Sequence, residues 1–218
     1  MTGQARTPPD TRSTARVGTG EVVAWTMLTA TAVAGVIGVA RQRREVRAVR
    51  RGELVPASAA ADVAPRRPAG TLVERLAAWV PSRPDGVGGR VAAALWAAPL
   101  TLVGFGVALG SGRVPRWDVE RGCFVARGVG GASSRALKLV GADANTIGQV
   151  VLARQTEPPA SLLDHEAVHV RQCERLGPLM IVAYPWLSAG YGYRDHPLER
   201  AARRGARRAS DGDGPRRG

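Results

Sequence analysis

Two long runs without a charged residue limit the folds open to this chain. The first covers Val22 to Ala40 and the second covers Val91 to Leu109. At 1.5 Å of rise per residue, each run would form a helix of about 28 Å, close to the hydrocarbon thickness of a bilayer. We therefore predict a transmembrane helix over 22–40 and another over 91–109. We expect an integral protein of the plasma membrane, with membrane lipids as partners.

The residues around the runs favour anchors over the alternatives. The block RQRREVRAVRR, which begins at Arg41, is typical of a segment that stops translocation. A signal peptide cleaved near Ala32 to Ala34 is one alternative, but the apolar run continues past that point. Helices buried in a soluble core are the other alternative. Pro99, inside the second run, is tolerated better in lipid than in a soluble helix.

The remaining segments differ in composition. The predicted organisation is a disordered arm (1–21), a basic Ala/Pro/Gly-rich linker (41–90) with one short helix near 71–80, a folded unit (113–208) and a disordered tail (209–218). In the folded unit, alternation over 117–127 predicts a β-hairpin, and 147–154 predicts another short strand. From residue 157 onward the pattern is helical. We therefore expect an α+β unit tethered by two N-terminal transmembrane helices.

The chain carries a formal net charge of +13, nearly all of it from arginine. Such charge suits nucleic acid or an anionic membrane surface. The basic tracts hold neither a recognition motif nor interleaved aromatics, and the flanks of the two runs account for the arginines. No specific nucleic-acid partner is expected. The two cysteines, Cys123 and Cys173, are expected as buried free thiols, with a disulfide in an oxidising compartment as the alternative.

One helix is bounded sharply by its flanking residues. Pro158-Pro159 and Ser161 precede it, and Gly177-Pro178 ends it, because glycine takes the left-handed conformation and proline cannot continue a helix. We predict a helix over 162–176, with the Ser161 side chain as N-cap and Asp164 as the answering acid.

This helix contains His165-Glu166-Ala167-Val168-His169, which fits the pattern HExxH. Residues i and i+4 project from one helical face, so both imidazoles can reach one ion. Glu166 lies one residue round, where its carboxylate can meet a water at the metal without being a ligand. Gln172 shares the histidine face and could bond a ligand or its water.

A catalytic zinc site usually has three protein ligands. Glu199 is the expected third ligand, at the start of a second helix in which Pro197 suits the first position. Two alternatives remain open. Glu199 could instead serve the backbone amides, with His196 as cap. Asp195 or His196 could be the ligand in its place.

The segments HEAVHVRQCERLGPL (165–179) and YRDHPLER (193–200) resemble gluzincin-type zinc metallopeptidases, in which a distal glutamate completes the HExxH site. They resemble more closely short bacterial membrane-associated proteins with HExxHxRQ, a Gly-Pro break and Tyr-Arg-Asp-x-Pro-x-Glu. The resemblance covers about 91–204. It implies a zincin-like domain, zinc at His165, His169 and Glu199, and Glu166 as general base. Cys173, Leu176, His196 and Leu198 depart from it, at positions where two aromatics, an asparagine and a phenylalanine are expected.

We expect a membrane-anchored, zinc-dependent hydrolase, and more specifically a metallopeptidase with a peptide or protein substrate. Candidate donors to the developing oxyanion lie near the distal glutamate: Tyr191, Tyr193, Arg194 and His196. The segment 179–191 is expected as a kinked helix lying under the site or dipping into the membrane interface. The alternative is a non-catalytic integral membrane protein with a structural or vestigial HExxH site.

The distribution of arginine also predicts a topology. Arginines are denser after the first run than before it, which puts 41–90 in the cytoplasm and the zinc domain outside after a second crossing. The second run has arginines on both sides, so its flanks do not indicate in which direction it would cross the membrane. The arginine-rich segment 200–208 would bind anionic lipid on the cytoplasmic face. On balance we expect an extracytoplasmic zinc domain.

Overall fold

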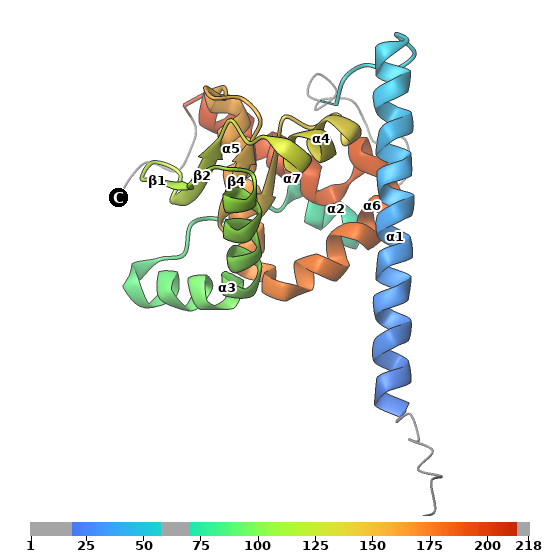
Figure 1. The fold of residues 1–218 in the computed structure, drawn as a ribbon, viewed down its shortest axis with the longest axis horizontal. Coiled ribbons are helices and arrows are strands. Elements are labelled where there is room, and N and C mark those ends of the chain that lie inside the picture. Colours follow the sequence, from blue (N-terminus) through green and yellow to red (C-terminus); the bar gives the residue numbers. More distant parts are fainter. Residues whose placement is uncertain (1–18, 58–69, 213–218) are drawn as a thin grey trace, which may run out of the picture.

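A computed structural model describes residues 19–57 and 70–212, so most of the predicted disordered arm, part of the linker and part of the tail lie outside the described residues. The chain is α+β, with two long apolar helices on the N-terminal side of a small mixed sheet, as expected (Figure 1). The elements are α1 (Thr19–Arg50), α2 (Thr71–Ala78), α3 (Gly86–Gly110), β1 (Arg116–Asp118), β2 (Cys123–Arg127), α4 (Gly131–Val140), β3 (Ala144–Ile147), β4 (Val150–Ala153), α5 (Ala160–Leu176), the 3-10 turn η1 (Gly177–Leu179), α6 (Met180–Asp195) and α7 (Pro197–Ser210).

Both α1 and α3 are long and apolar enough to cross a membrane. The helix α1 continues ten residues past the predicted end of the first run and includes the basic segment 41–50, which we had expected in the linker. Arginine is a good helix former, and the fourth-residue spacing of Arg43 and Arg47 allows the Arg47 side chain to bond the Arg43 carbonyl at 3.3 Å. The short helix predicted at 71–80 is present as α2.

The four strands form one sheet in the order β1-β2-β4-β3. The predicted hairpin at 117–127 is confirmed, since β1 pairs antiparallel with β2. The strand expected over 147–154 is present as β4, but its start differs: β3, which was not expected, ends at Ile147, the chain turns at Gly148, and β4 returns antiparallel. Gly148 has φ +63° and packs against the Thr101 backbone, so this turn requires glycine. The strand β4 runs parallel to β2, with α4 between them in the chain.

Helices cover both faces of the sheet. On one face, Phe105 and Ala108 of α3 pack with Leu137 of α4 against β2 and β4. On the other face, Leu163 and Val170 of α5 pack against the same two strands. The helix α7 lies behind α5, and α2 lies against α7. The helix α3, which contains Pro99, bends along its length, so that its first half turns away from the sheet (Figure 1).

The ends of α5 differ partly from the prediction. The helix starts at Ala160 with Pro159 as its N-cap, and no side chain caps it, so the predicted Ser161 cap is wrong. Asp164 accepts a hydrogen bond from Arg121 Nε at 2.9 Å instead of answering a cap. Arg121 comes from the β1–β2 turn, and its partly buried ion pair with Asp164 connects the helix to the sheet. Gly177 ends the helix at φ +52°, as expected.

The helix α6 runs alongside α1. A Cβ atom on Gly38 would lie 2.7 Å from Ser188 Cβ, and one on Gly35 would lie 4.0 Å from Pro185 Cβ. The two glycines therefore let the helices approach closely. Near its end α6 breaks at Gly192, which has φ +71° and ψ 178°. The predicted helix over 179–191 is therefore present. Its non-helical residue is Gly192 rather than Pro185.

Candidate metal centre

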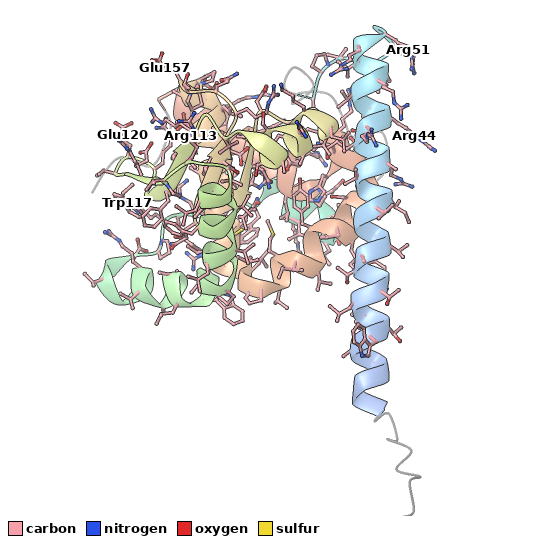
Figure 2. All side chains as sticks on the ribbon, in the orientation of Figure 1. Arg44, Arg51, Arg113, Trp117, Glu120 and Glu157 are labelled. Carbon is pink, nitrogen blue, oxygen red and sulfur yellow. The ribbon has the colours of Figure 1, made fainter. Side chains whose placement is uncertain are left out.

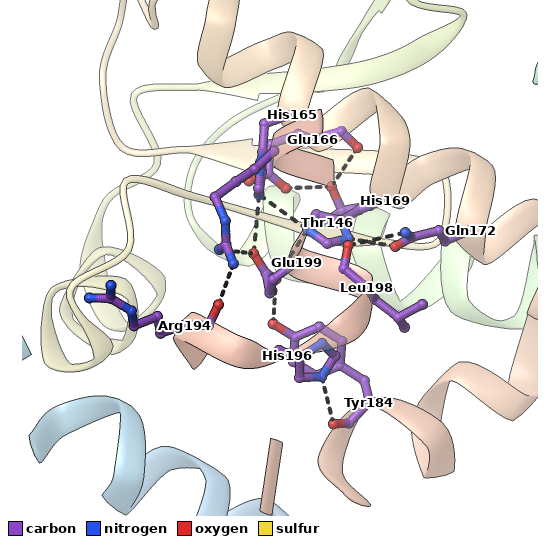
Figure 3. A network of polar contacts seen from close by, with 11 residues as sticks. Thr146, His165, Glu166, His169, Gln172, Tyr184, Arg194, His196, Leu198 and Glu199 are labelled. Carbon is purple, nitrogen blue, oxygen red and sulfur yellow. Dashed lines mark hydrogen bonds and ion pairs between the residues drawn. The ribbon is translucent and has the colours of Figure 1, made fainter. Parts of the chain in front are cut away.

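Three side chains from two helices converge on one point (Figure 3). His165 and His169 come from the middle of α5, and Glu199 comes from the first turn of α7; their ligand atoms lie within 4.8 Å of one another. The two Nε2 atoms are 3.2 Å apart. Glu199 Oε2 lies 3.2 Å from His165 Nε2, and Oε1 lies 3.1 Å from His169 Nε2. The structure thus brings together the three residues expected as ligands.

The packing of α7 on α5 sets this convergence. Pro197 occupies the start of α7, as predicted, and orients the first turn towards α5. Farther along, a Cβ atom on Gly205 would lie 2.5 Å from Val168 Cγ2, so the glycine lets the two helices approach closely. Glu199 is 3% exposed. A buried carboxylate between two imidazoles is costly unless a charge compensates it, which makes the cluster suited to a cation.

Gln172 fixes the tautomer of His169. Its Nε2 atom donates to the Leu198 carbonyl at 3.2 Å, which turns the amide oxygen towards His169 Nδ1 at 2.8 Å. Because that oxygen can only accept, Nδ1 carries a proton, and Nε2 is the atom that faces Glu199 and would bind a cation once it is deprotonated. Gln172 therefore bonds a ligand, as expected, and its role is to orient the imidazole for a metal.

Glu199 is held by further partners. The Tyr184 hydroxyl donates to Oε1 at 2.7 Å, and Arg203 Nη1 lies 3.9 Å from Oε2. Burial raises the pKa of Glu199, but His169 and His165 outweigh it and hold that pKa well below its usual range. Burial lowers the pKa of His169, and Glu199 reverses this and raises it to about 9. The carboxylate therefore stays ionised, as a metal ligand must.

Glu166 stands beside the cluster and outside it. Its Oε2 atom accepts a hydrogen bond from Thr146 Oγ1 of β3 at 2.7 Å, and the side chain is nearly buried. The strand β3 therefore fixes the carboxylate that we expect to act as general base. No ligand atom of Glu166 belongs to the metal cluster among the described residues, in agreement with a carboxylate that assists rather than coordinates.

The centre opens into a cavity of about 620 Å³. His165, Glu166 and Tyr193 line it on the side of the cluster. The opposite wall is formed by α1, from Gln42 to Arg50, and by the extended segment Leu54 to Ala57. The Val55 carbonyl accepts a hydrogen bond from Arg194 Nη1 at 3.1 Å, which ties this segment to the end of α6.

The alternative ligands do not join the cluster. His196 is fully buried, and its Nε2 donates to the Tyr184 carbonyl at 3.2 Å; burial lowers its pKa to about 4. Asp195 is also outside the cluster. His196 does stand in the N-cap position of α7, but its side chain makes no capping bond. Of the expected oxyanion donors, Tyr193 and Arg194 line the cavity.

Three functional partners were missed by the sequence reasoning: Thr146, Tyr184 and Arg203. Arg203 follows Glu199 by four residues on one predicted helix, a spacing that could have identified it. Tyr184 is one of several hydroxyl-bearing residues in an otherwise apolar segment, and nothing in the sequence singles it out. Thr146 has no local signal, since only the packing of β3 on α5 brings it to Glu166. The two cysteines are buried free thiols, as expected.

A metal ion fits this group of residues, whose two imidazoles and one carboxylate are all common ligands of transition metals. No family model, curated protein or solved structure matches the chain. The resemblance to gluzincin-type peptidases therefore stays a prediction that rests on the motif residues.

Proposed function

We propose that this protein is a membrane-associated zinc hydrolase with a zincin-like domain, acting as a metallopeptidase. The observation that supports it most is the meeting of His165, His169 and Glu199, with Glu166 beside them. Two histidines and one glutamate form one of the ligand sets of catalytic zinc. Zinc bound there would polarise a substrate carbonyl and lower the pKa of water towards neutrality.

The protein residues then have distinct roles. Glu166, held by Thr146, accepts the proton of the attacking water and delivers it to the leaving amine. Gln172 keeps the Nε2 atom of His169 directed at the centre. Tyr193 lines the cavity and is the candidate donor to the developing oxyanion. The cavity volume lies within the range typical of ligand sites, which suits a short peptide segment.

The test is elemental analysis of the detergent-purified full chain together with hydrolysis of a peptide library. We expect about one zinc per chain, lost in His169→Ala and in Glu199→Ala. Glu166→Gln should keep the zinc and lose all hydrolysis, because it removes the proton acceptor and spares the ligands.

Two results would contradict the proposal. If the unmutated chain holds no zinc after zinc supplementation, HExxH does not mark a metal site here. If zinc binds but Glu166→Gln leaves the hydrolysis unchanged, the centre is structural, which is the non-catalytic alternative.

A further inference from the structure

The apolar helix α3 begins and ends against the same small sheet. Before the helix, Pro81 and Pro84 are buried, and the Arg83 guanidinium packs against Gly122, immediately before β2. After the helix, Arg113 Nε donates to the Gly128 carbonyl at 2.8 Å, immediately after β2. The two flanks of α3 are thus attached to the two ends of one five-residue strand.

The lengths of β2 and α3 agree with a helix whose two flanks return to the same strand. The six residue-to-residue steps of extended chain from Gly122 to Gly128 cover roughly 20 Å. A straight helix of 25 residues, the length of α3, covers roughly 37 Å. Pro99 lies inside α3, where it removes a helical hydrogen bond. The helix bends along its length, with its second half on the sheet and its first half turned away (Figure 1). A Cβ atom on Gly104, in the second half, would lie 2.8 Å from Val150 Cβ, so this half packs closely on the core.

The domain that holds α3 also packs against the arginine-rich half of α1. Arg41 Nη1 donates to the Gly190 carbonyl at 2.8 Å, and Glu45 Oε2 accepts from the Arg194 amide at 3.0 Å. Val46 packs against Gly141, after α4. Figure 2 shows Arg51, immediately after α1, and Glu157, before α5, at the same end of the molecule. The apolar part of α1 continues beyond the domain at the other end, where Trp25 and Leu28 are exposed.

We infer that α3 does not cross the bilayer: among the described residues only α1 crosses it, and the metal centre lies on the side of the α1 arginines. Arginine-rich flanks stay on the cytoplasmic side of a membrane, so the centre faces the cytoplasm. This inference concerns only the membrane topology, and it replaces the extracytoplasmic location expected from sequence. It does not require the centre to be catalytic.

The bilayer is also the partner for the apolar surface that α3 and α6 leave exposed. On the first half of α3, Val91, Leu95 and Trp96 are exposed. On α6, Ile181 and Trp186 are exposed. The two surfaces adjoin, because Trp96 packs against Gly177, just before α6.

The position of α6 along α1 indicates the depth of this surface. Trp186 Nε1 donates to Thr31 Oγ1 at 3.4 Å, and Ser188 faces Gly38, so α6 lies beside the last turns of the apolar run. Residues 31–40 of α1 rise about 15 Å, half of a hydrocarbon core. The first half of α3 and the part of α6 up to Ser188 therefore lie in the cytoplasmic leaflet, whereas the end of α6 lies beside the basic segment of α1. Arg90 of α3 is exposed and long enough to reach the head groups.

Cysteine labelling in bacterial spheroplasts tests the topology on the full chain. Thr19→Cys, Glu53→Cys and Glu157→Cys place single reporters at the start of α1, after α1 and after α3. The unmutated chain is the matched control, because Cys123 and Cys173 are buried and burial raises the pKa of each thiol to about 12. A membrane-impermeant maleimide should label the reporter at 19 in intact spheroplasts and those at 53 and 157 only after permeabilisation.

Other labelling patterns overturn the inference. Labelling at 157 but not at 53 in intact spheroplasts would mean that α3 crosses the membrane. Labelling at both positions would put the centre outside, and protection at 19 would mean that α1 does not cross. None of these outcomes depends on hydrolysis, so failure here is distinct from failure of the proposed function.

A second measurement tests the leaflet contact. A nitroxide on Leu95→Cys, in vesicles of phosphatidylethanolamine and phosphatidylglycerol, should be accessible to oxygen and shielded from a water-soluble nickel chelate. Leu139→Cys on α4 is the control, since Leu139 is also an exposed leucine and α4 packs beside the basic half of α1. Equal nickel accessibility at both positions would exclude the lipid contact.

Discussion

At the residue scale, the centre depends on hydrogen bonds behind the ligands. Gln172 is fully buried and makes two hydrogen bonds, one to His169 and one to the Leu198 carbonyl. Residues behind the ligands matter to a metal site because they fix the tautomer and the orientation of each imidazole. A free imidazole samples both tautomers and several orientations. Tyr184 likewise orients the Glu199 carboxylate through the hydrogen bond that its hydroxyl donates.

Gln172→Ala should therefore weaken zinc binding by about 10- to 100-fold while the three ligands remain. The measurement is competition with a chromophoric chelator in detergent. Gln155→Ala is the control, because Gln155 is exposed in the loop after β4. Equal zinc affinity in the two variants would contradict the orienting role of Gln172.

His196 predicts a pH dependence of stability. Its pKa falls from 6.5 to about 4 on folding, because burial disfavours the imidazolium. Between these values the unfolded chain binds a proton that the folded chain does not, so the free energy of unfolding decreases as the pH falls from 6.5 to 4. The decrease amounts to about 1.4 kcal/mol per pH unit, or roughly 3 kcal/mol in total.

His196→Asn removes this titration and places there the residue expected from the resemblance. Between pH 7 and pH 4.5, its unfolding midpoint in detergent should decrease less than that of the unmutated chain. Groups common to both proteins cancel in the comparison. Parallel pH profiles would show that His196 is not buried in its neutral form.

At the element scale, the site depends on how closely two pairs of helices approach. Gly205 sets the spacing of α7 from α5, and Gly38 sets the spacing of α6 from α1. The first spacing carries Glu199 to the histidines. The second holds Tyr184 and the cavity wall in place, because α6 supplies the tyrosine and α1 lines the cavity.

Gly205→Leu should lower stability by about 1–3 kcal/mol and weaken zinc binding, since the added side chain displaces α7 from Val168. Thermal unfolding and chelator competition measure the two effects. Ala209→Leu is the control on the same helix, at an exposed position. Unchanged zinc affinity in Gly205→Leu would mean that the spacing of α5 and α7 does not set the ligand geometry.

At the scale of the whole molecule, the centre links three parts of the fold. The helix α5 lies on the sheet, α7 lies on α5, and α6 reaches α1. A cation that binds the folded chain and not the unfolded one stabilises all of these contacts together. Without a cation, the buried Glu199 carboxylate is compensated by hydrogen bonds and ion pairs from its neighbours: the two histidines, Tyr184, Tyr193 and Arg203.

Zinc removal should therefore lower the unfolding temperature. At a free zinc concentration of about 1,000 times Kd, binding adds about 4 kcal/mol, which corresponds to roughly 10 °C for a chain of this size. Differential scanning fluorimetry with and without a chelator measures the shift. Glu199→Ala should show no chelator effect, and an equal shift in both proteins would mean that the chelator acts elsewhere.

Local spacing in the sequence was enough to place His165 and His169 on one helical face, whereas Glu199 was expected with Asp195 and His196 as open alternatives. The four-residue spacing of His165 and His169 follows from helical geometry, and Pro197 and Gly177 delimit their helices through backbone conformations that few other residues adopt. The class of fold and the apolar length of α1 and α3 were likewise predictable, because they depend on residues close together in the chain.

Only the tertiary structure decided what these elements meet. Thr146 and Tyr184 reach the centre from separate elements, a strand and another helix, and no local pattern relates them to it. Asp164 accepts a hydrogen bond from Arg121, 43 residues away in the sequence, instead of taking part in the expected helix cap. An apolar run indicates that a helix is shielded from water. It does not indicate whether lipid or the sheet of the same protein provides the shielding. For α3 the answer came from its two flanks, which return to the same strand.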